Sequence, residues 1–183
     1  MTLVELLVTM TILALVILVV TGMLIRSSRL ESRTVRRAEL QAATRQALAL
    51  FTTELRQAGA DPRNPPAGVV GIVTADSTRI RVRADLNGDG TLQTTEPSED
   101  VTYGYNDTTK VVTRDPGSGA APILSNVTFM RLTYFNAAGQ QLGPLPLSTA
   151  NAALVTSIRL RVTSQRKDSQ PLALDTRITL RNR

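Results

Sequence analysis

The chain of 183 residues contains neither cysteine nor histidine. Without cysteine, no disulfide can staple its loops, and thiolate metal sites and cysteine redox chemistry are excluded. Without histidine, no serine can act through a serine–histidine pair, and the sequence contains no carboxylate pair in a defined frame and no phosphate-binding glycine loop. These absences argue against an enzyme.

Lysine and aromatic residues are scarce. All but Lys110 and Lys167 of the 21 basic residues are arginine, and the formal net charge is +6. A positive net charge favours an anionic partner or a solvated basic surface. Three tyrosines and three phenylalanines, with no tryptophan, offer few platforms for stacking on bases. We expect most of these rings to fill the core.

Charged side chains are also scarce in the first 25 residues, where Glu5 is the only ionisable side chain before Arg26. As a helix rising about 1.5 Å per residue, this stretch reaches roughly 37 Å, enough to cross a hydrocarbon layer about 30 Å thick. It lacks the basic leading region and the small-residue cleavage site of a secretory signal peptide. We therefore expect residues 1–25 to be a transmembrane helix that stays in the mature protein.

The same helix is expected to continue well beyond the span, because Gly22 is the only glycine or proline before Gly59. We predict one helix from about Thr2 to Ala58, with 26–60 as its amphipathic half. Its arginine-rich surface is either solvated, packed on other subunits, or able to contact nucleic acid or lipid phosphates. Its apolar stripe recurs at three- and four-residue spacing and comprises Leu40, Ala43, Ala47, Leu48, Phe51, Leu55 and Ala58.

A proline-rich linker at 61–68 precedes a region of alternating periodicity. In the last two of its candidate strands, one face is apolar and the other is basic, so the apolar face is expected to cover the helix. The predicted fold class is α+β, a long N-terminal helix packed on a C-terminal antiparallel β-sheet in a domain spanning 61–183. The candidate strands are 69–74, 78–84, 101–106, 110–114, 127–136, 154–164 and 172–181.

Glu5 needs a specific explanation, because a charged side chain in a membrane helix costs roughly 3 kcal/mol on insertion scales. The α-amino group of Met1 is four residues away on the same rigid helix, so pairing between neighbouring subunits is geometrically easier. Two unit charges about 4 Å apart attract by about 4 kcal/mol at an effective dielectric of 20, which offsets that cost. We expect Met1 and Glu5 to set the register of assembly.

The first twenty residues, MTLVELLVTMTILALVILVV, closely resemble the N-terminus of type IV pilins and type II secretion pseudopilins. The resemblance extends more loosely to 50–59, to 126–142 and to the ending ITLRNR, which look like minor subunits of the PilW and pseudopilin J type. Many major pilins have a proline near position 22 and a C-terminal cysteine pair. Gly22 and the missing cysteines therefore favour a minor pilin or a pseudopilin.

The resemblance implies the pilin fold and a chain in its mature form, cut by a prepilin peptidase and N-methylated at Met1. It implies storage in the bacterial inner membrane as a single-pass protein, followed by extraction by an assembly platform into a polymer of pilin subunits at the cell surface or in the periplasm. We expect a minor pilin acting in pilus biogenesis, adhesion, twitching motility or DNA uptake. A secretion pseudopilin, a major pilin and a single-span receptor domain remain alternatives.

The segment DLNGDGTLQTTE at 85–96 fits the calcium-loop pattern D-x-[DN]-x-[DN]-G-x5-E. Alternate oxygen-bearing side chains can wrap a hard cation, while Gly90 permits the sharp bend. The flanking segments are predicted to be strands, so a Ca²⁺ loop would lie within a sheet. A bound ion would hold the loop in place, a role that no disulfide can take in this chain. Alternatively, its Asn-Gly and Asp-Gly dipeptides form a hairpin without metal. The predicted ligands are Asp85, Asn87, Asp89, Thr91, Gln93 and Glu96.

Overall fold

The computed structural model describes residues 2–63, 69–93, 99–166 and 169–181, apart from the side chains at positions 29, 32 and 33. Its first element is the long helix α1, Leu3–Gln57, close to the predicted bounds. The chain divides into two compact units, Met1–Leu40 and Gln41–Arg183. The last turns of α1 belong to the second unit, together with all the strands. The fold is α+β, a long apolar N-terminal helix and a C-terminal antiparallel sheet domain, as predicted.

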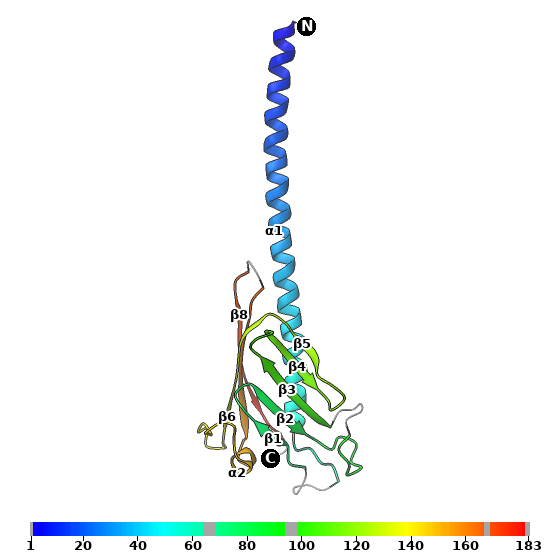
Figure 1. The fold of residues 1–183 in the computed structure, drawn as a ribbon, viewed down its shortest axis with the longest axis vertical. Helices are drawn as coiled ribbons and strands as arrows, with labels where there is room; N and C mark the ends of the chain where they lie inside the picture. The colour runs from blue at the N-terminus through cyan, green and yellow to red at the C-terminus, as the bar shows by residue number, and fades with distance from the viewer. Residues whose placement is uncertain (1, 64–68, 94–98, 167–168, 182–183) are drawn as a thin grey trace. The chain divides into compact units, whose positions relative to one another are not determined.

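The strands form two antiparallel sheets (Figure 1). One sheet has the order β1-β2-β3-β4-β5 and the other the order β6-β7-β8, so every neighbouring pair in a sheet is consecutive in sequence. Short connections therefore suffice for most pairs. The bounds are β1 Ile72–Ala75, β2 Arg79–Arg83, β3 Asp100–Asn106, β4 Val111–Asp115, β5 Ala121–Leu124, β6 Val127–Phe135, β7 Ser157–Ser164 and β8 Leu172–Thr179, with a short helix α2, Thr149–Ala153, before β7.

The last turns of α1 supply one wall of the core of the second unit. Ala47, Phe51, Leu55 and Ala58 are buried, as the predicted stripe requires. The prediction for Ala43 is wrong, because Ala43 is exposed and its neighbour Thr44 is buried instead. The hydroxyl of Thr44 lies 3.3 Å from that of Ser164 at the end of β7. A hydrogen bond to a buried partner makes this polar side chain tolerable in an apolar wall.

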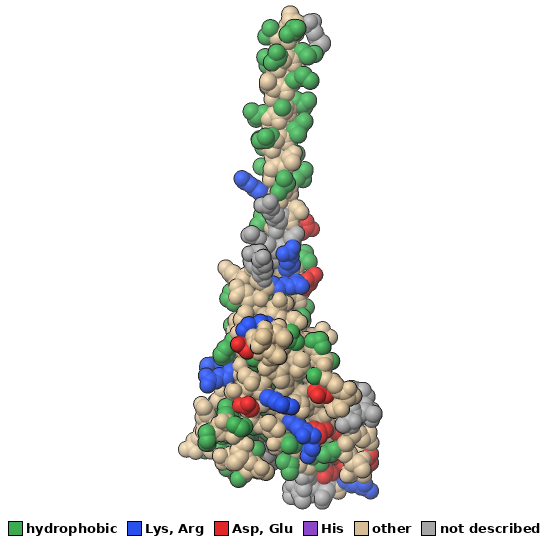
Figure 2. Space-filling view, in the orientation of Figure 1, with side chains coloured by type: hydrophobic (Ala, Val, Ile, Leu, Met, Phe, Trp, Pro, Cys, Tyr) green, Lys and Arg blue, Asp and Glu red, His purple; other side chains and the backbone are tan. Residues whose placement is uncertain are grey.

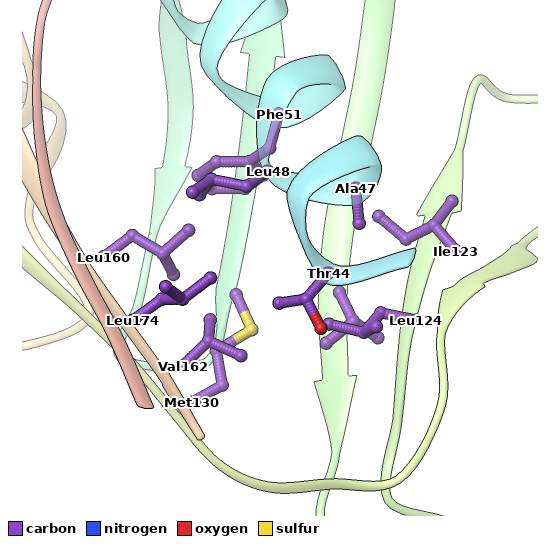
Figure 3. A pocket seen from close by; sticks show the side chains of 11 residues that line it. Thr44, Ala47, Leu48, Phe51, Ile123, Leu124, Met130, Leu160, Val162 and Leu174 are labelled. Carbon is purple, nitrogen blue, oxygen red and sulfur yellow. The ribbon is translucent and has the colours of Figure 1, made fainter. Parts of the chain in front are cut away.

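An apolar hollow remains where α1 meets both sheets (Figure 3). Its walls come from α1 and from both sheets. The lining residues are Thr44, Ala47, Leu48 and Phe51 from α1, Val112, Ile123 and Leu124 from the first sheet, and Met130, Leu160, Val162 and Leu174 from the second.

Glu54 fastens the helix to the first sheet through two polar contacts. Its Oε1 accepts hydrogen bonds from Nε and Nη2 of Arg114 at 2.9 and 2.6 Å, and its Oε2 accepts one from the hydroxyl of Tyr103. The Tyr103 ring is fully buried and meets Phe51 edge to face at 4.6 Å. Burial, with the nearby Glu54 charge, raises the pKa of Tyr103, so its hydroxyl stays a donor. We call these three polar residues the Glu54 clamp.

Glu54→Ala is expected to lower the free energy of unfolding of the second unit by about 3 kcal/mol. The substitution leaves the Tyr103 hydroxyl and the largely buried Arg114 guanidinium without their acceptor. Urea denaturation of the full chain in a non-ionic detergent, followed by tyrosine fluorescence, measures this loss. Tyr103→Phe removes one hydrogen bond and should cost about 1 kcal/mol, whereas Thr53→Ala on the exposed side of the same turn should cost far less. A loss for Glu54→Ala no larger than for Thr53→Ala would contradict the clamp.

Candidate functional site

The first candidate site is the apolar surface at the start of α1. The 26 residues of Leu3–Ser28 are long and apolar enough to span a membrane, and none of the apolar window within them is buried. On the face turned to the viewer in Figure 2, hydrophobic side chains follow this stretch until the first charged side chain. Exposed apolar area of this extent is unusual on a soluble monomer. Such a surface is compatible with a covering of lipid or of other protein.

Glu5 caps its own helix in this structure. Its Oε2 accepts a hydrogen bond from the backbone N–H of Thr2 at 2.9 Å, and its own backbone N–H donates to the Thr2 hydroxyl at 3.4 Å. This reciprocal pair is a capping box, which satisfies donors that a helix start otherwise leaves free. Glu5 therefore has a local role besides the predicted pairing between subunits. Met1, the other predicted assembly residue, lies outside the described residues.

The second candidate site is the connection between β2 and β3, here called the carboxylate loop, residues 84–99. Gly88 and Gly90 adopt φ of 71° and 82°. Glycine reaches this left-handed region without strain, so each can supply a tight turn. Gly90 thus provides the sharp bend that the sequence pattern predicts. The flanking elements are strands, as expected.

Asp85 lies at the floor of the loop with only 1% of its surface exposed. Its Oδ1 accepts a hydrogen bond from the backbone N–H of Gly88 at 2.6 Å, and its Oδ2 accepts one from that of Gly90 at 2.9 Å. Its own backbone N–H donates to the carbonyl of Ala60 at 2.8 Å. These bonds wrap the chain around one carboxylate and tie it to the end of the helical segment.

Glu99 is equally buried and approaches Asp85 from the start of β3. Its Oε1 accepts hydrogen bonds from the backbone N–H groups of Leu86 and Asn87 at 2.7 and 3.2 Å, and its Oε2 accepts one from that of Gln93 at 3.0 Å. Three backbone donors on one carboxylate compensate for its removal from water. Glu99 therefore organises both limbs of the loop.

Asp89 completes the cluster from the exposed side. Its Oδ1 accepts from the hydroxyl and the backbone N–H of Thr91, both at 2.7 Å, and its Oδ2 accepts from the side-chain amides of Asn87 and Gln93 at 2.9 and 2.6 Å. The Thr91 hydrogen bonds hold the pKa of Asp89 below its ordinary value. Asp89 is therefore ionised at neutral pH, as a metal ligand must be.

The donor set of the loop fits a hard divalent cation. One carboxylate oxygen from each of Asp85, Asp89 and Glu99 lies within 4.8 Å of the other two. Oxygen-only ligands with several negative charges suit Ca²⁺ or Mg²⁺ and do not suit zinc or copper. In this conformation the amide nitrogens of Asn87 and Gln93 donate to Oδ2 of Asp89, and Oδ1 of Asn87 accepts a hydrogen bond from the backbone N–H of Asp89 at 2.9 Å. The cluster is compatible with a cation, and its hydrogen bonds are equally compatible with a hairpin that folds without one.

The structure thus brings together two predicted ligands, Asp85 and Asp89, with Asn87, Thr91 and Gln93 around them. Glu96, the predicted closing ligand, lies outside the described residues. Glu99 was missed because the calcium pattern ends at position 96. The signal that could have found it is strand register: Arg83 pairs with Asp100, so extending the ladder by one residue places Ala84 opposite Glu99, next to Asp85. The backbone N–H of Ala84 does donate to the Glu99 carbonyl at 2.9 Å.

Comparison with known proteins adds no family name to these sites. No protein-family model matches the chain, and no curated protein matches it. The functional argument therefore depends on the residues and on their geometry.

Proposed function

We propose that this chain is a structural subunit of a bacterial filament, a minor pilin of a type IV pilus, with an architectural and not a catalytic role. The observation that carries the proposal is an exposed apolar helical surface, Leu3–Ser28, in which Glu5 is the only ionisable side chain before Arg26. Its resemblance to pilin N-termini supports the proposal, and the α+β fold is compatible with it. The same surface also fits a second interpretation, that the chain is a pseudopilin of a type II secretion system.

The proposed partners follow from what can cover this surface. Lipid of the bacterial inner membrane covers it before assembly, and neighbouring pilin helices cover it in the filament. Exchange of lipid for protein removes no apolar area from water and so gains little hydrophobic free energy, and packing and polar contacts must decide the balance. Glu5 can decide it by pairing with the α-amino group of an adjacent subunit. A prepilin peptidase would expose that amino group, and an assembly platform would extract the chain.

The proposal is tested by mass spectrometry of filaments sheared from cells and purified. A minor pilin is expected at a small fraction of the major subunit, with an N-methylated first residue. Abundance equal to the main component would make the chain the major pilin instead. Complete absence from surface filaments, together with loss of protein secretion on deletion of the gene, would identify a secretion pseudopilin.

We also propose that the carboxylate loop binds Ca²⁺. Asp85 and Glu99 are buried, Asp89 is exposed, and their oxygens converge. A cation there would neutralise three neighbouring carboxylates and tie both limbs of the loop together. Since the chain has no cysteine, the ion would take the stabilising role that a disulfide has in other small extracellular domains.

Removing Ca²⁺ is expected to lower the melting temperature of the second unit by about 5–10 °C. A ligand at about 100 times its dissociation constant stabilises a fold by about 2.7 kcal/mol, and each kcal/mol shifts the melting temperature by about 2–4 °C at this size. Circular dichroism melts of the full chain in a non-ionic detergent, in 1 mM Ca²⁺ and in excess chelator, measure the shift.

Asp89→Ala should abolish the response to chelator, because it removes the exposed ligand while the buried floor of the loop remains. Asp107→Ala, which removes an exposed carboxylate of the β3–β4 turn, is the matched control and should leave the response intact. Identical melts in Ca²⁺ and in chelator would favour a hairpin without metal.

A further inference from the structure

The exposed side of the second sheet carries a dense group of arginines. From Ile158 onward, buried residues of β7 alternate with half-buried or exposed ones, so one side faces the core and the other faces solvent. The pairing register then places the partners of the exposed residues on the same side. We call this side the arginine face; its charged residues are Arg131, Arg159, Arg161, Asp175 and Arg177.

Two pairs of arginines lie directly opposite each other across the strands. Arg131 of β6 pairs with Arg161 of β7, and Arg159 of β7 pairs with Arg177 of β8. Directly opposed like charges weaken a sheet, because their side chains are only about 5 Å apart at Cβ. The arrangement therefore costs stability in the isolated chain, and an anion bound between the guanidinium groups would remove that cost.

One carboxylate partly balances the group. Asp175 accepts a bidentate pair of hydrogen bonds from Arg159 at 2.7 and 2.6 Å and one from Nε of Arg161 at 3.0 Å. All three side chains remain more than two-fifths exposed. Asp175 thus orients two guanidinium groups without covering them, and their remaining N–H donors face solvent.

The other two arginines have no carboxylate among the described residues. Nε of Arg177 donates to the hydroxyl of Ser157 at 3.0 Å, and its guanidinium lies 4.5 Å above the ring of Phe135. Both of these partners are uncharged, so the charge of Arg177 stays uncompensated. Arg131 is exposed and makes no ion pair within the described part of the chain. The face therefore has four cations against one anion.

An exposed aromatic ring borders the arginines. Phe129 pairs with Thr163 across β6 and β7, two residues from the Arg131–Arg161 pair and on the same face. It is 45% exposed, although the core of this unit buries most other large apolar side chains. A ring beside guanidinium groups on a sheet surface is the combination on which unpaired bases stack while their phosphates are bound.

From this juxtaposition we propose that the arginine face binds the phosphodiester backbone of a nucleic acid, with Phe129 stacking on an unpaired base. Guanidinium groups bind phosphate oxygens in bidentate fashion, which fits the use of arginine and not lysine here. Successive arginines of β7 lie about 6.6 Å apart along the strand, so neighbouring phosphates can each meet a different pair. The residues of this face all lie on β6, β7 and β8, and the inference does not depend on filament assembly.

The test is fluorescence anisotropy of a labelled 20-nucleotide single strand with the full chain in a non-ionic detergent. Binding is expected to weaken steeply with salt. Arg131→Gln with Arg161→Gln should weaken it at least tenfold and should reduce the slope of log K against log salt by about 1.4, the contribution of two phosphate contacts on a single strand. Phe129→Ala should weaken it by about fivefold or more.

Arg56→Gln with Arg79→Gln is the matched control, since both side chains are exposed and lie on other elements. This variant removes the same net charge and should stay within twofold of wild type. Circular dichroism melts of each variant confirm that the fold is kept.

Two kinds of result would overturn the proposal. One is an equal loss of binding in the control pair, or no loss in the Arg131 and Arg161 pair. The other is arginine-dependent binding of heparin or of phosphatidylglycerol vesicles as tight as that of the oligonucleotide, which would assign the face to acidic polysaccharide or to membrane. Equal affinity for a 20-base-pair duplex, with no effect of Phe129→Ala, would refute base stacking.

Discussion

Replacement of Glu5 by alanine is expected to leave the chain in the membrane and to remove it almost entirely from filaments. In the proposed assembly, the Glu5 carboxylate pairs with an α-amino group of a neighbouring subunit. Loss of about 3–4 kcal/mol from that contact corresponds to at least a hundredfold lower incorporation. Immunoblots of sheared filaments and of the membrane fraction measure the two pools. Incorporation at the wild-type level would contradict the pairing role.

Glu5→Gln separates pairing from helix capping. Glutamine at this position can still accept the hydrogen bond from the Thr2 backbone, because a capping box accommodates either side chain. It cannot form an ion pair. If charge pairing matters, Glu5→Gln should fail as completely as Glu5→Ala, whereas Thr2→Val should assemble nearly normally. Normal assembly of Glu5→Gln with failure of Thr2→Val would show that Glu5 acts only by capping.

Glu99→Ala is expected to lower the free energy of unfolding of the second unit by about 3 kcal/mol or more. Three backbone N–H groups donate to its carboxylate in a buried position, and each orphaned donor costs about 1–3 kcal/mol. Urea denaturation of the full chain in detergent, with chelator present throughout, measures the loss without any contribution from a bound cation.

Asp89→Ala is the appropriate comparison for Glu99, because it removes a carboxylate with four hydrogen bonds from the same loop. Asp89 is exposed, so water can replace the lost acceptor, and we expect a cost well below that of Glu99→Ala. Equal costs would mean that the buried contacts of Glu99 do not hold the loop together.

The long helix and most strands were predictable because they follow simple periodic patterns. The start of α1 contains no proline and only one glycine, and β7 alternates polar with apolar residues from Ser157 to Thr163. Strand β5 was missed because it is four residues long and contains Pro122, which cannot donate to a ladder. Helix α2 was not predicted; it ends at Ala153, just before the predicted strand 154–164, and Ser148 caps it by accepting from the backbone N–H of Asn151.

The division into two sheets was not predictable, because local alternation fixes which face of a strand is buried and not which strand begins a new sheet. The same limit explains Thr44. Its burial depends on Ser164, which is 120 positions away and supplies the hydrogen-bond partner. Helical periodicity places position 44 nearer than position 43 to the centre of the buried stripe, but a threonine is acceptable there only with such a partner.

The candidate sites show the same division between local and distant information. Thr2 and Glu5 have capping-box spacing, a purely local signature that could have been read from the sequence. The calcium pattern likewise located Asp85 and Asp89 correctly within one loop. Glu99 could be placed beside them only once the register of β2 and β3 was known. The arginine face also needs register, because only cross-strand pairing reveals that arginines oppose each other.

The Glu54 clamp has a mechanical consequence. Because the chain is continuous, any pulling force on the N-terminal segment enters the second unit through the last turns of α1 and through no other segment. The first contacts to resist it are those of these turns with the two sheets, of which the Glu54 hydrogen bonds to Arg114 and Tyr103 are directional and short-ranged. Such contacts yield abruptly when stretched, whereas apolar packing yields gradually. Pulling would load the contacts of Thr44 and Ala47 first, so the clamp is expected to resist the final detachment of the helix from the first sheet.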